Sequence, residues 1–430
     1  MIIVFGLLAL AVVAALYRYL WRRLVRDTTT GWGRPRRLGT ALFVAGPAMM
    51  FAALFAELGH APFLLQRVLA WPGFLWMALS LYLLLAVVAG EVARPLLGRL
   101  LERSPRKHPG PERPFGGAGN RATSHHGEQL SPQTEAPLRQ LTRTENPAPA
   151  PAPASAPTRR LFVSRVVGGA AATAAVTTVG LGTYGVLRGP GVKRVTVPLA
   201  KLPRAAHGYR IAVVSDIHLG PVLGRGFAQR VVDTVNATQP DLIAVVGDLV
   251  DGSVQDLGPA AAPLAQLSAR HGSYFVTGNH EYFSGAPQWI EEVRTLGLRP
   301  LENARTELTH FDLAGVNDLA GESTGQGPDF DRALAGRDPA RACVLLAHQP
   351  VQIHEAVRHH VDLQLSGHTH GGQLWPGNIV AAAANPTVAG LDRYGDTQLY
   401  VSRGAGAWGP PTRVGAPSDI TVIELASRQA

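Results

Sequence analysis

Three long apolar runs mark the first hundred residues. Ile2–Tyr17 is unbroken, Leu38–Ala56 ends at a glutamate, and Phe74–Gly90 ends at another. They approach or reach the length that a bilayer-spanning helix needs, and they lack the polar face of a helix in a soluble core. We therefore predict a membrane module of three transmembrane helices in residues 1–100. A cleaved signal peptide is the alternative for the first run, but no basic residues precede its apolar stretch, which argues against cleavage.

The next segment, residues 101–157, has the composition of a linker. It is rich in Pro, Gly, Ser and charged residues, and residues 147–154 alternate proline with alanine. Such a segment cannot bury enough apolar surface to offset the entropy lost on ordering, so we predict disorder with polyproline-II character.

A milder apolar run follows at Val166–Leu187, with an arginine pair ahead of it. The stretch Thr158–Val163 (TRRLFV), before a weakly apolar segment rich in Gly, Ala and Thr, resembles a twin-arginine export signal. Its position after three spans is unusual for such a signal, and arginine pairs also occur at 22–23 and 36–37. Since no clear Ala-x-Ala cleavage pattern ends the run, we predict that residues 158–189 form a signal helix retained as an anchor.

Arginine is distributed unevenly around the apolar runs, and the distribution predicts an orientation. The loop after the first run and the segment after the third are dense in arginine, whereas the loop after the second holds only Arg67. Positively charged loops stay in the cytoplasm. We therefore expect a multi-pass protein of the cell membrane, with the N-terminus and residues 190–430 outside the cytoplasm and the linker inside.

The pattern changes in residues 190–430, where short apolar runs alternate with polar loops. Two segments there have helical period, Phe227–Ala237 and Pro287–Leu296. Seven runs have the length of strands: Val195–Val197, Ile211–Val214, Leu242–Val246, Tyr274–Thr277, Val344–Leu346, Leu363–Leu365 and Asp419–Leu425. The alternation predicts an α/β domain, and in open α/β sheets functional groups gather at the carboxyl ends of strands.

Five of these runs stop at motifs with metal-ligand chemistry: SDIHLG at 215–220, GDLVDG at 247–252, GNHEYF at 278–283, LAHQP at 346–350 and LSGHTHGGQLWP at 365–376. Together they supply three oxygen donors and four imidazoles, from Asp216, Asp248, Asn279, His218, His348, His368 and His370. A pair of close cations needs a shared carboxylate and a mixed nitrogen and oxygen shell, so the motifs predict a two-metal hydrolase site. We expect the D-x-H and H-x-H pairs to be extended, because alternate residues of a strand face the same side.

In this order the motifs resemble calcineurin-like metallophosphoesterases, and the GHTHGGQ form behind membrane segments is similar to a bacterial membrane-anchored subgroup. The resemblance covers residues 192–426 and implies a β-sandwich flanked by helices (αββα). It implies two divalent metal ions, one bound by Asp216, His218 and His370, the other by Asn279, His348 and His368, with Asp248 bridging them. It further implies hydrolysis of phosphomonoesters or diesters by attack of a hydroxide held between the metals.

The resemblance gives the remaining catalytic roles to His280 and Asp251. His280 follows a metal ligand and matches the residue that contacts the leaving-group oxygen, and Asp251 matches the carboxylate that orients this histidine. A carboxylate on one ring nitrogen raises the pKa of an imidazole and fixes its tautomer. Glu281 could support the site or merely pack, Trp375 could line the cleft or the core, and the loop Arg403–Trp408 is a candidate lip of the cleft.

Composition narrows the expected partners. The net charge of +9 comes mostly from arginines beside apolar segments, and no basic stripe interleaved with aromatic residues occurs in the motif half, so we expect no nucleic acid. The single cysteine, Cys343, excludes an internal disulfide and a cysteine-rich metal site. Its place in an apolar run predicts a buried thiol.

The expected partners are a phosphoester substrate, the lipid bilayer and the twin-arginine export machinery. An anchored site favours lipid-linked or cell-envelope phosphoesters, and the nitrogen and oxygen donors suit Mn, Fe and Zn alike. Two alternatives remain open. One is a binding or sensor module at the membrane that keeps metals with weak turnover, and the other is a cytoplasm-facing hydrolase of nucleotide-linked lipids.

Overall fold

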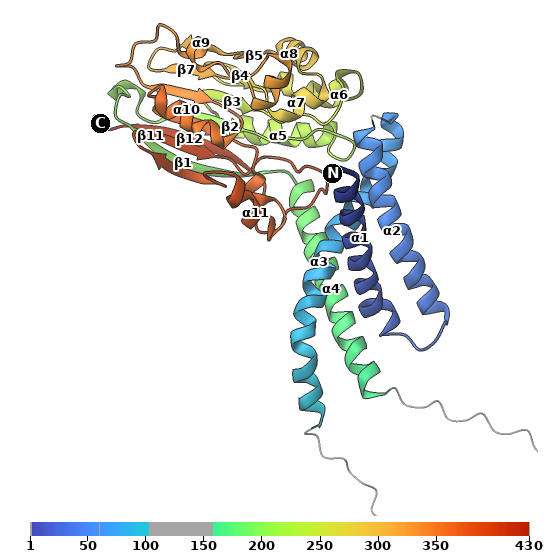
Figure 1. The fold of residues 1–430 in the computed structure, drawn as a ribbon. Helices are drawn as coiled ribbons and strands as arrows, with labels where there is room; N and C mark the ends of the chain where they lie inside the picture. The colour runs from blue at the N-terminus through green and yellow to red at the C-terminus, as the bar shows by residue number, and fades with distance from the viewer. Residues whose placement is uncertain (1, 60, 103–157, 430) are drawn as a thin grey trace, which may run out of the picture.

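The computed structural model describes residues 2–59, 61–102 and 158–429. A bundle of long helices stands against one side of a domain built from sheets and short helices (Figure 1). The predicted linker falls almost wholly outside the described residues, so its disorder and the proposed division of the chain stay predictions.

The bundle contains four long helices and a π-helical turn: α1 (Ile2–Trp21), η1 (Arg22–Arg26), α2 (Arg34–Leu58), α3 (Phe63–Glu102) and α4 (Arg159–Leu187). Within the part of the chain that the structure describes, three helices are long and apolar enough to cross a membrane: α2, the stretch Phe63–Leu96 of α3, and α4. The third predicted run therefore covers only the middle of its helix. Side chains of several of the first residues of α1 lie outside the described set, so its role as a span stays a prediction.

Small residues let the helices of the bundle approach closely. A Cβ atom built on Gly73 of α3 would lie 2.6 Å from the side chain of Ala53 and 2.7 Å from the carbonyl of Met49, both on α2. On the other side of α3, a Cβ on Gly90 would lie 2.6 Å from Val167 of α4. Close approach through small residues is the usual way in which helices pack inside a bilayer.

The α1–α2 turn lies at the end of the bundle far from the sheet domain. Arg23 Nη2 lies 2.9 Å from Glu91 Oε2 in the second half of α3, and Arg165 Nε near the start of α4 donates to the carbonyl of Thr28 at 3.0 Å. The α2–α3 turn and the carboxyl end of α4 lie at the opposite end, where the chain enters β1 (Figure 1).

The sheet domain contains two six-stranded sheets among the described residues. The first has the order β1 (Gly191–Leu199), β12 (Asp419–Ser427), β2 (Tyr209–Val214), β3 (Leu242–Val246), β4 (Ser273–Val276) and β5 (Leu298–Pro300). The second has the order β10 (Gly390–Tyr394), β11 (Thr397–Val401), β9 (Leu363–Ser366), β8 (Cys343–Leu346), β7 (Asp312–Gly315) and β6 (Ala304–Glu307). β2 to β5 are parallel, as are β11, β9, β8 and β7.

Helices cover the outer face of each sheet. α5 (Arg225–Ala237), α6 (Val254–Ala261), η3 (Ala262–Gln266) and α8 (Ala286–Thr295) pack on the first sheet, and α9 (Phe330–Leu334) and α10 (Ile353–Arg358) pack on the second. The remaining short elements are η2 (Arg204–Ala206), α7 (Asn279–Ser284), η4 (Leu319–Thr324), η5 (Pro350–Gln352), η6 (His370–Gly372) and α11 (Gly377–Ala384). The predicted α/β class, with a sandwich flanked by helices, is confirmed.

Burial on both faces explains why the strands appear as unbroken apolar runs. Along β2, Ile211 and Val213 belong to the core between the two sheets, whereas Ala212 and Val214 belong to the core under α5. A strand covered on both faces needs apolar residues at every position. The strands that the pattern missed include the edge strand β10, which carries exposed polar side chains.

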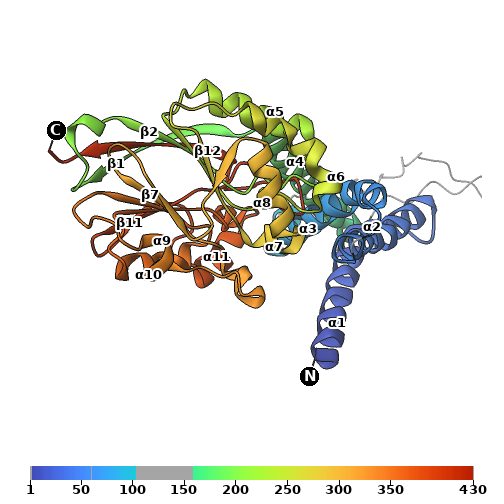
Figure 2. The same cartoon turned by 90° about the horizontal axis from the view of Figure 1, so that it is seen from above.

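The bundle and the sheet domain touch through loops that follow the strands. Val222 packs against a small cluster on α2 and α3 that contains Phe74, and Thr183 Oγ1 of α4 lies 2.7 Å from Thr412 Oγ1. Tyr82 of α3 donates its hydroxyl to the carbonyl of Trp375 at 3.0 Å. Figure 2 shows the bundle at the edge of the sandwich where α6 and α7 lie.

Candidate metal centre

All seven candidate metal ligands follow the carboxyl ends of strands. Three of these strands, β2, β3 and β4, belong to the first sheet, and two, β8 and β9, belong to the second. The ligands therefore meet at one edge of the sandwich, where loops from both sheets converge. The loops after β2 and β3 run side by side, since the amides of Asp216 and His218 donate to the carbonyls of Gly247 and Asp248 at 3.1 and 3.2 Å.

The backbone at the ligands is not extended, so this expectation was wrong. φ is 51° at Asp216, 48° at His218, 52° at Asp248, 72° at His368 and 53° at His370. The left-handed region costs a non-glycine residue roughly 1–2 kcal/mol. Five such residues in one site are maintained by the surrounding contacts, and strained backbone of this kind gathers at functional sites.

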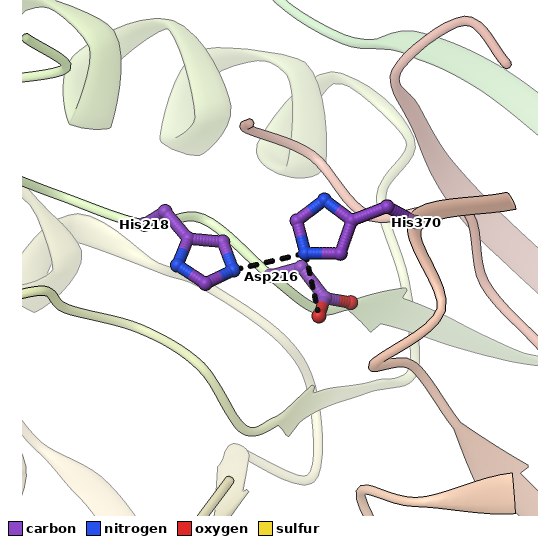
Figure 3. A group of neighbouring side chains, drawn as sticks. All are labelled: Asp216, His218 and His370. Atoms are coloured by element: carbon purple, nitrogen blue, oxygen red, sulfur yellow. Dashed lines mark hydrogen bonds and ion pairs between the residues drawn. The ribbon is translucent and has the colours of Figure 1, made fainter. Parts of the chain in front are cut away.

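Asp216, His218 and His370 form the first group (Figure 3). The Nε2 atoms of the two histidines lie 3.0 Å apart, and His370 Nε2 lies 3.4 Å from Asp216 Oδ1. Asp251 lies 2.9 Å from His218 Nδ1, so the proton of a neutral His218 ring belongs on that nitrogen and Nε2 presents its lone pair. All three side chains are buried, and their facing Nε2 and carboxylate oxygen atoms lie close enough together to hold a cation.

Asp248, His348 and His368 form the second group, with Asn279 beside it. His348 Nδ1 donates to the carbonyl of Val246 at 2.8 Å, which leaves the lone pair on Nε2. This Nε2 atom is buried without a hydrogen bond, 3.1 Å from Asp248 Oδ2. His368 Nδ1 lies 3.0 Å from Asn279 Oδ1.

Asp248 lies between the two groups. Its Oδ2 atom is 3.1 Å from His348 Nε2 and 3.8 Å from His218 Nε2, so one carboxylate oxygen faces a histidine of each group. Burial opposes a charge on His348, but the neighbouring Asp248 raises the pKa of this histidine well above its usual value. Burial and the charge of His218 lower the pKa of His370 well below its usual value. A divalent metal beside Asp248 would take the place of the proton that this environment favours on His348, because metal binding needs the neutral imidazole.

His280 and Asp251 form a pair next to the first group. His280 Nδ1 lies 2.7 Å from Asp251 Oδ1. Burial opposes charge on both side chains, yet His218 and His280 lower the pKa of Asp251 to about 2, and the hydrogen bond to Asp251 raises the pKa of His280 to about 9. The predicted contact between His280 and Asp251 is present. Asp251 also lies within hydrogen-bond distance of His218 Nδ1. Asp251 therefore holds His280 through Nδ1 and favours its protonated form.

Aromatic side chains flank His280. The ring centroids of Phe283 and Trp408 each lie 5.5 Å from that of His280, in edge-on geometry. Phe283 is 66% exposed and Trp408 is 54% exposed, so both rings border solvent beside the histidine. Trp408 ends the loop that the sequence marked as a lip of the cleft. Trp375 is also exposed, so its predicted alternative as a core residue was wrong.

Glu281 supports the ligand loops, a role that the sequence left open. It is fully buried, and its carboxylate accepts from the amides of Gly278 at 2.6 Å, Leu249 at 2.7 Å and Asp248 at 3.0 Å. One side chain thus joins the loops after β3 and β4. The GNHE motif is the signal that could have indicated this role.

Arg413 contacts His370, and the sequence pattern did not indicate it. Its guanidinium is buried, with Nε donating to the carbonyl of Gly406 at 2.6 Å and Nη1 donating to the carbonyls of His370 at 3.0 Å and Ala416 at 3.1 Å. Nη2 lies 3.2 Å from His370 Nδ1. No motif surrounds Arg413 in the sequence, so only the fold reveals that it supports the last ligand.

Two glycines allow the loops to meet. A Cβ on Gly367 would lie 1.8 Å from Ser215 Oγ, and one on Gly278 would lie 2.2 Å from Asp248 Oδ1. Neither position has room for a side chain. The close approach of a neighbouring ligand loop, rather than a turn, explains these two glycines.

Comparison with known proteins fits this geometry. The family model for calcineurin-like phosphoesterases matches residues 209–372, which include every candidate ligand. A Danio rerio protein called transmembrane protein with metallophosphoesterase domain is 39% identical over 269 residues, which are 59% of this chain and 62% of that protein. An uncharacterized metallophosphoesterase of Helicobacter pylori is 38% identical over 247 residues, 57% of this chain and 66% of that protein.

A third relative matches over nearly its whole length. An uncharacterized metallophosphoesterase of Aquifex aeolicus is 34% identical over 242 residues, which are 55% of this chain and 92% of that protein. The chain spans less than two thirds of the length of the Danio rerio relative.

Proposed function

Because this chain belongs to the calcineurin-like metallophosphoesterases and has helices long enough to cross a membrane, we propose that it is a metal-dependent phosphoesterase with a dinuclear centre. We further propose that it is anchored in the cell membrane, with its active site outside the cytoplasm. Asp216, His218 and His370 would hold one divalent ion, Asn279, His348 and His368 the other, and Asp248 would contact both. Two such ions, when bound, neutralise phosphate oxygens and lower the pKa of a water molecule.

The position of Asp248 carries this proposal. A carboxylate oxygen that faces His218 on one side and His348 on the other is suited to join two cations. The buried Nε2 atom of His348 makes no hydrogen bond in the described structure, and a buried polar atom of this kind calls for a ligand. Mn, Fe and Zn all fit the donor set.

His280 would protonate the leaving-group oxygen. Its Nδ1 atom is held by Asp251, so the ring cannot turn away and its second nitrogen remains available to the substrate. The exposed rings of Phe283 and Trp408 border this side of the site. An apolar leaving group, such as the lipid part of a lipid-linked or cell-envelope phosphoester, would contact these rings favourably.

The test uses the full-length protein in detergent, stripped with a chelator and reloaded with single metals. We expect two ions per chain by elemental analysis and hydrolysis of nitrophenyl phosphomonoesters or diesters by the loaded protein alone. Lipid-linked phosphoesters should be better substrates than soluble ones of the same bond type. Two bound ions without hydrolysis of any ester tested would contradict the enzyme and favour the binding or sensor module.

The distribution of charge along the bundle supports the proposed orientation. The end far from the sheet domain gathers most of the arginines of the described bundle: Arg22, Arg23, Arg26, Arg34, Arg36, Arg37, Arg94, Arg99, Arg159, Arg160 and Arg165. This end would stay in the cytoplasm by the positive-inside rule. The α2–α3 turn and the sheet domain would then lie outside.

Cysteine labelling of intact spheroplasts tests the orientation. Cys343 is buried and is replaced by alanine, and single cysteines are placed at Thr30 in the α1–α2 turn and at Ser323 in η4, both exposed. A membrane-impermeant maleimide should label position 323 and leave position 30 unlabelled until the cells are lysed. Labelling of 30 alone would place the enzyme in the cytoplasm and restore nucleotide-linked lipids as candidate substrates.

We further propose that α4 is exported by the twin-arginine machinery and retained. The side chain of Thr158 caps this helix by accepting from the amide of Leu161 at 3.3 Å, so Arg159 and Arg160 occupy its first turn. Val167, about two turns further on, packs against α3, which favours retention over cleavage. Replacing both arginines with lysine should block labelling at position 323. Unchanged labelling would show that ordinary membrane insertion carries the domain across.

A further inference from the structure

One segment of the sheet domain has the composition of a membrane contact. Residues 371–391 form a stretch of twenty-one residues without Asp, Glu, Lys or Arg, although such residues make up 17% of the chain. α11, with the sequence GNIVAAAA, lies within it. None of the eight residues of this helix, all of them described, is buried. Ile379 is 65% exposed and Val380 is 73% exposed.

A helix that exposes apolar side chains around most of its circumference is energetically unfavourable in water. A surface helix of a soluble domain turns an apolar face to the core and a polar face to the solvent, whereas α11 is apolar around most of its circumference and buries no residue. Trp375, two residues before the helix, is also 52% exposed. Contiguous exposed apolar surface marks a site of interaction.

The contacts of this segment place it alongside the helices α3 and α4. The carbonyl of Trp375 accepts from the hydroxyl of Tyr82 of α3. The membrane-length stretch Phe63–Leu96 has 34 residues, whereas a bilayer needs about 20, so a span that ends at Leu96 has Tyr82 near its outer end. Leu374 packs against the apolar cluster that α3 and α4 form together. Figure 1 shows α11 next to the part of the bundle where α3 and α4 meet the sheet domain.

We propose that α11 and Trp375 lie in the bilayer interface and that lipid covers their exposed apolar side chains. Helices without charge and with tryptophan at one end are suited to the boundary between headgroups and acyl chains, where the indole ring is favourably placed. Leu374 and Trp375 contact α3 and the cluster that it forms with α4, so a bilayer that surrounds these spans would also reach α11. Lipid is therefore favoured over a second copy of this chain or another protein as the occupant.

The same segment connects the bilayer to the metal centre. It begins directly after His370, and the side chain of Gln373 joins it to the 408–410 loop by donating to the carbonyl of Trp408 at 2.9 Å and accepting from its amide at 3.1 Å. The site would thus lie at the level of the lipid headgroups. This consequence for the substrate rests on the proposed function, whereas the insertion of α11 does not.

Depth-dependent fluorescence quenching tests the insertion. The full-length chain, with Cys343 replaced by alanine, receives a single cysteine at Val380, is labelled with an environment-sensitive fluorophore and is reconstituted into phosphatidylethanolamine and phosphatidylglycerol vesicles. The matched control is the same label at Asp331, a residue of α9 whose side chain is 96% exposed, on the far side of the domain. Quenchers are nitroxide-labelled lipid in the membrane and iodide in the water.

We expect lipid-borne quencher to reduce emission at position 380 several-fold more than at position 331, and iodide to show the reverse order. Equal quenching by iodide at the two positions would overturn the proposal, because α11 would then face water. Protection of position 380 from both quenchers would overturn it in favour of a protein partner. The readout requires no turnover, so failure of the proposed phosphoesterase activity would leave it unaffected.

Discussion

The loops at the metal centre and the helices of the bundle are stabilised in opposite ways. At the centre, most of the polar side chains are buried, hydrogen bonds join the ligand loops, and five residues other than glycine adopt positive φ. In the bundle, backbones are regular helices, and small and apolar residues make most of the contacts between α3 and its neighbours. Single changes at the centre should therefore have large and specific effects, whereas single changes at the helix contacts should have small ones.

The largest effect is expected from Asp248→Asn. The change removes the charge that faces both histidine groups, so both metals should bind more weakly and turnover should fall by several orders of magnitude. Elemental analysis and nitrophenyl ester hydrolysis measure the two quantities. Asp233→Asn, at an exposed position on α5, is the matched control and should leave both unchanged. Normal turnover with two tightly held metals would contradict the role of Asp248.

His280→Ala comes next. It should keep both metals and lower the rate roughly 10²–10⁴-fold, the range typical of a residue that transfers a proton. The loss should be smaller for nitrophenyl esters than for alkyl esters, since a good leaving group needs little protonation. His354→Ala, at an exposed position on α10, controls for the loss of a histidine. An equal loss for both leaving groups would contradict the role of His280 as a proton donor and indicate that it only stabilises charge.

Glu281→Gln should act on stability more than on chemistry. The amide places a donor against backbone amides that now donate to the carboxylate, which should cost about 1–3 kcal/mol. Thermal unfolding in detergent, followed by circular dichroism, should show a lower midpoint. Glu291→Gln, on the exposed face of α8, should change the midpoint little because exposed ion pairs contribute about 0–1 kcal/mol. Equal midpoints for the two variants would show that the loops do not depend on Glu281.

The smallest effect is expected where the bundle meets the sheet domain. Tyr82→Phe removes one hydrogen bond, to the carbonyl of Trp375, and should cost about 0.5–1.5 kcal/mol. Metal content and hydrolysis of a soluble ester should stay unchanged. Tyr184→Phe, at an exposed position on α4, is the control. A large loss of metal or turnover in Tyr82→Phe, but not in Tyr184→Phe, would contradict the expected small effect of bundle contacts. It would show that the bundle controls the metal centre.

The local sequence pattern was sufficient to predict many of the helices, strands and candidate ligands of this protein. Membrane-length helices appear in the sequence because a bilayer imposes a length and a composition. The strands ahead of the ligands appear as apolar runs because both of their faces are buried. The candidate ligands were found since each follows a strand and carries a donor type that metals prefer, and the structure brings these seven side chains together at one edge of the sandwich.

Tertiary structure alone decided the features that depend on contacts between distant segments. Asp216 and His218 leave the extended conformation because the neighbouring loop accepts their amides, and Arg413 reaches His370 only across the folded domain. The level of α11 in the bundle depends on Tyr82, which is distant in sequence. A sequence pattern records what each residue needs around it, namely burial, charge or a turn, but not which distant segment supplies it.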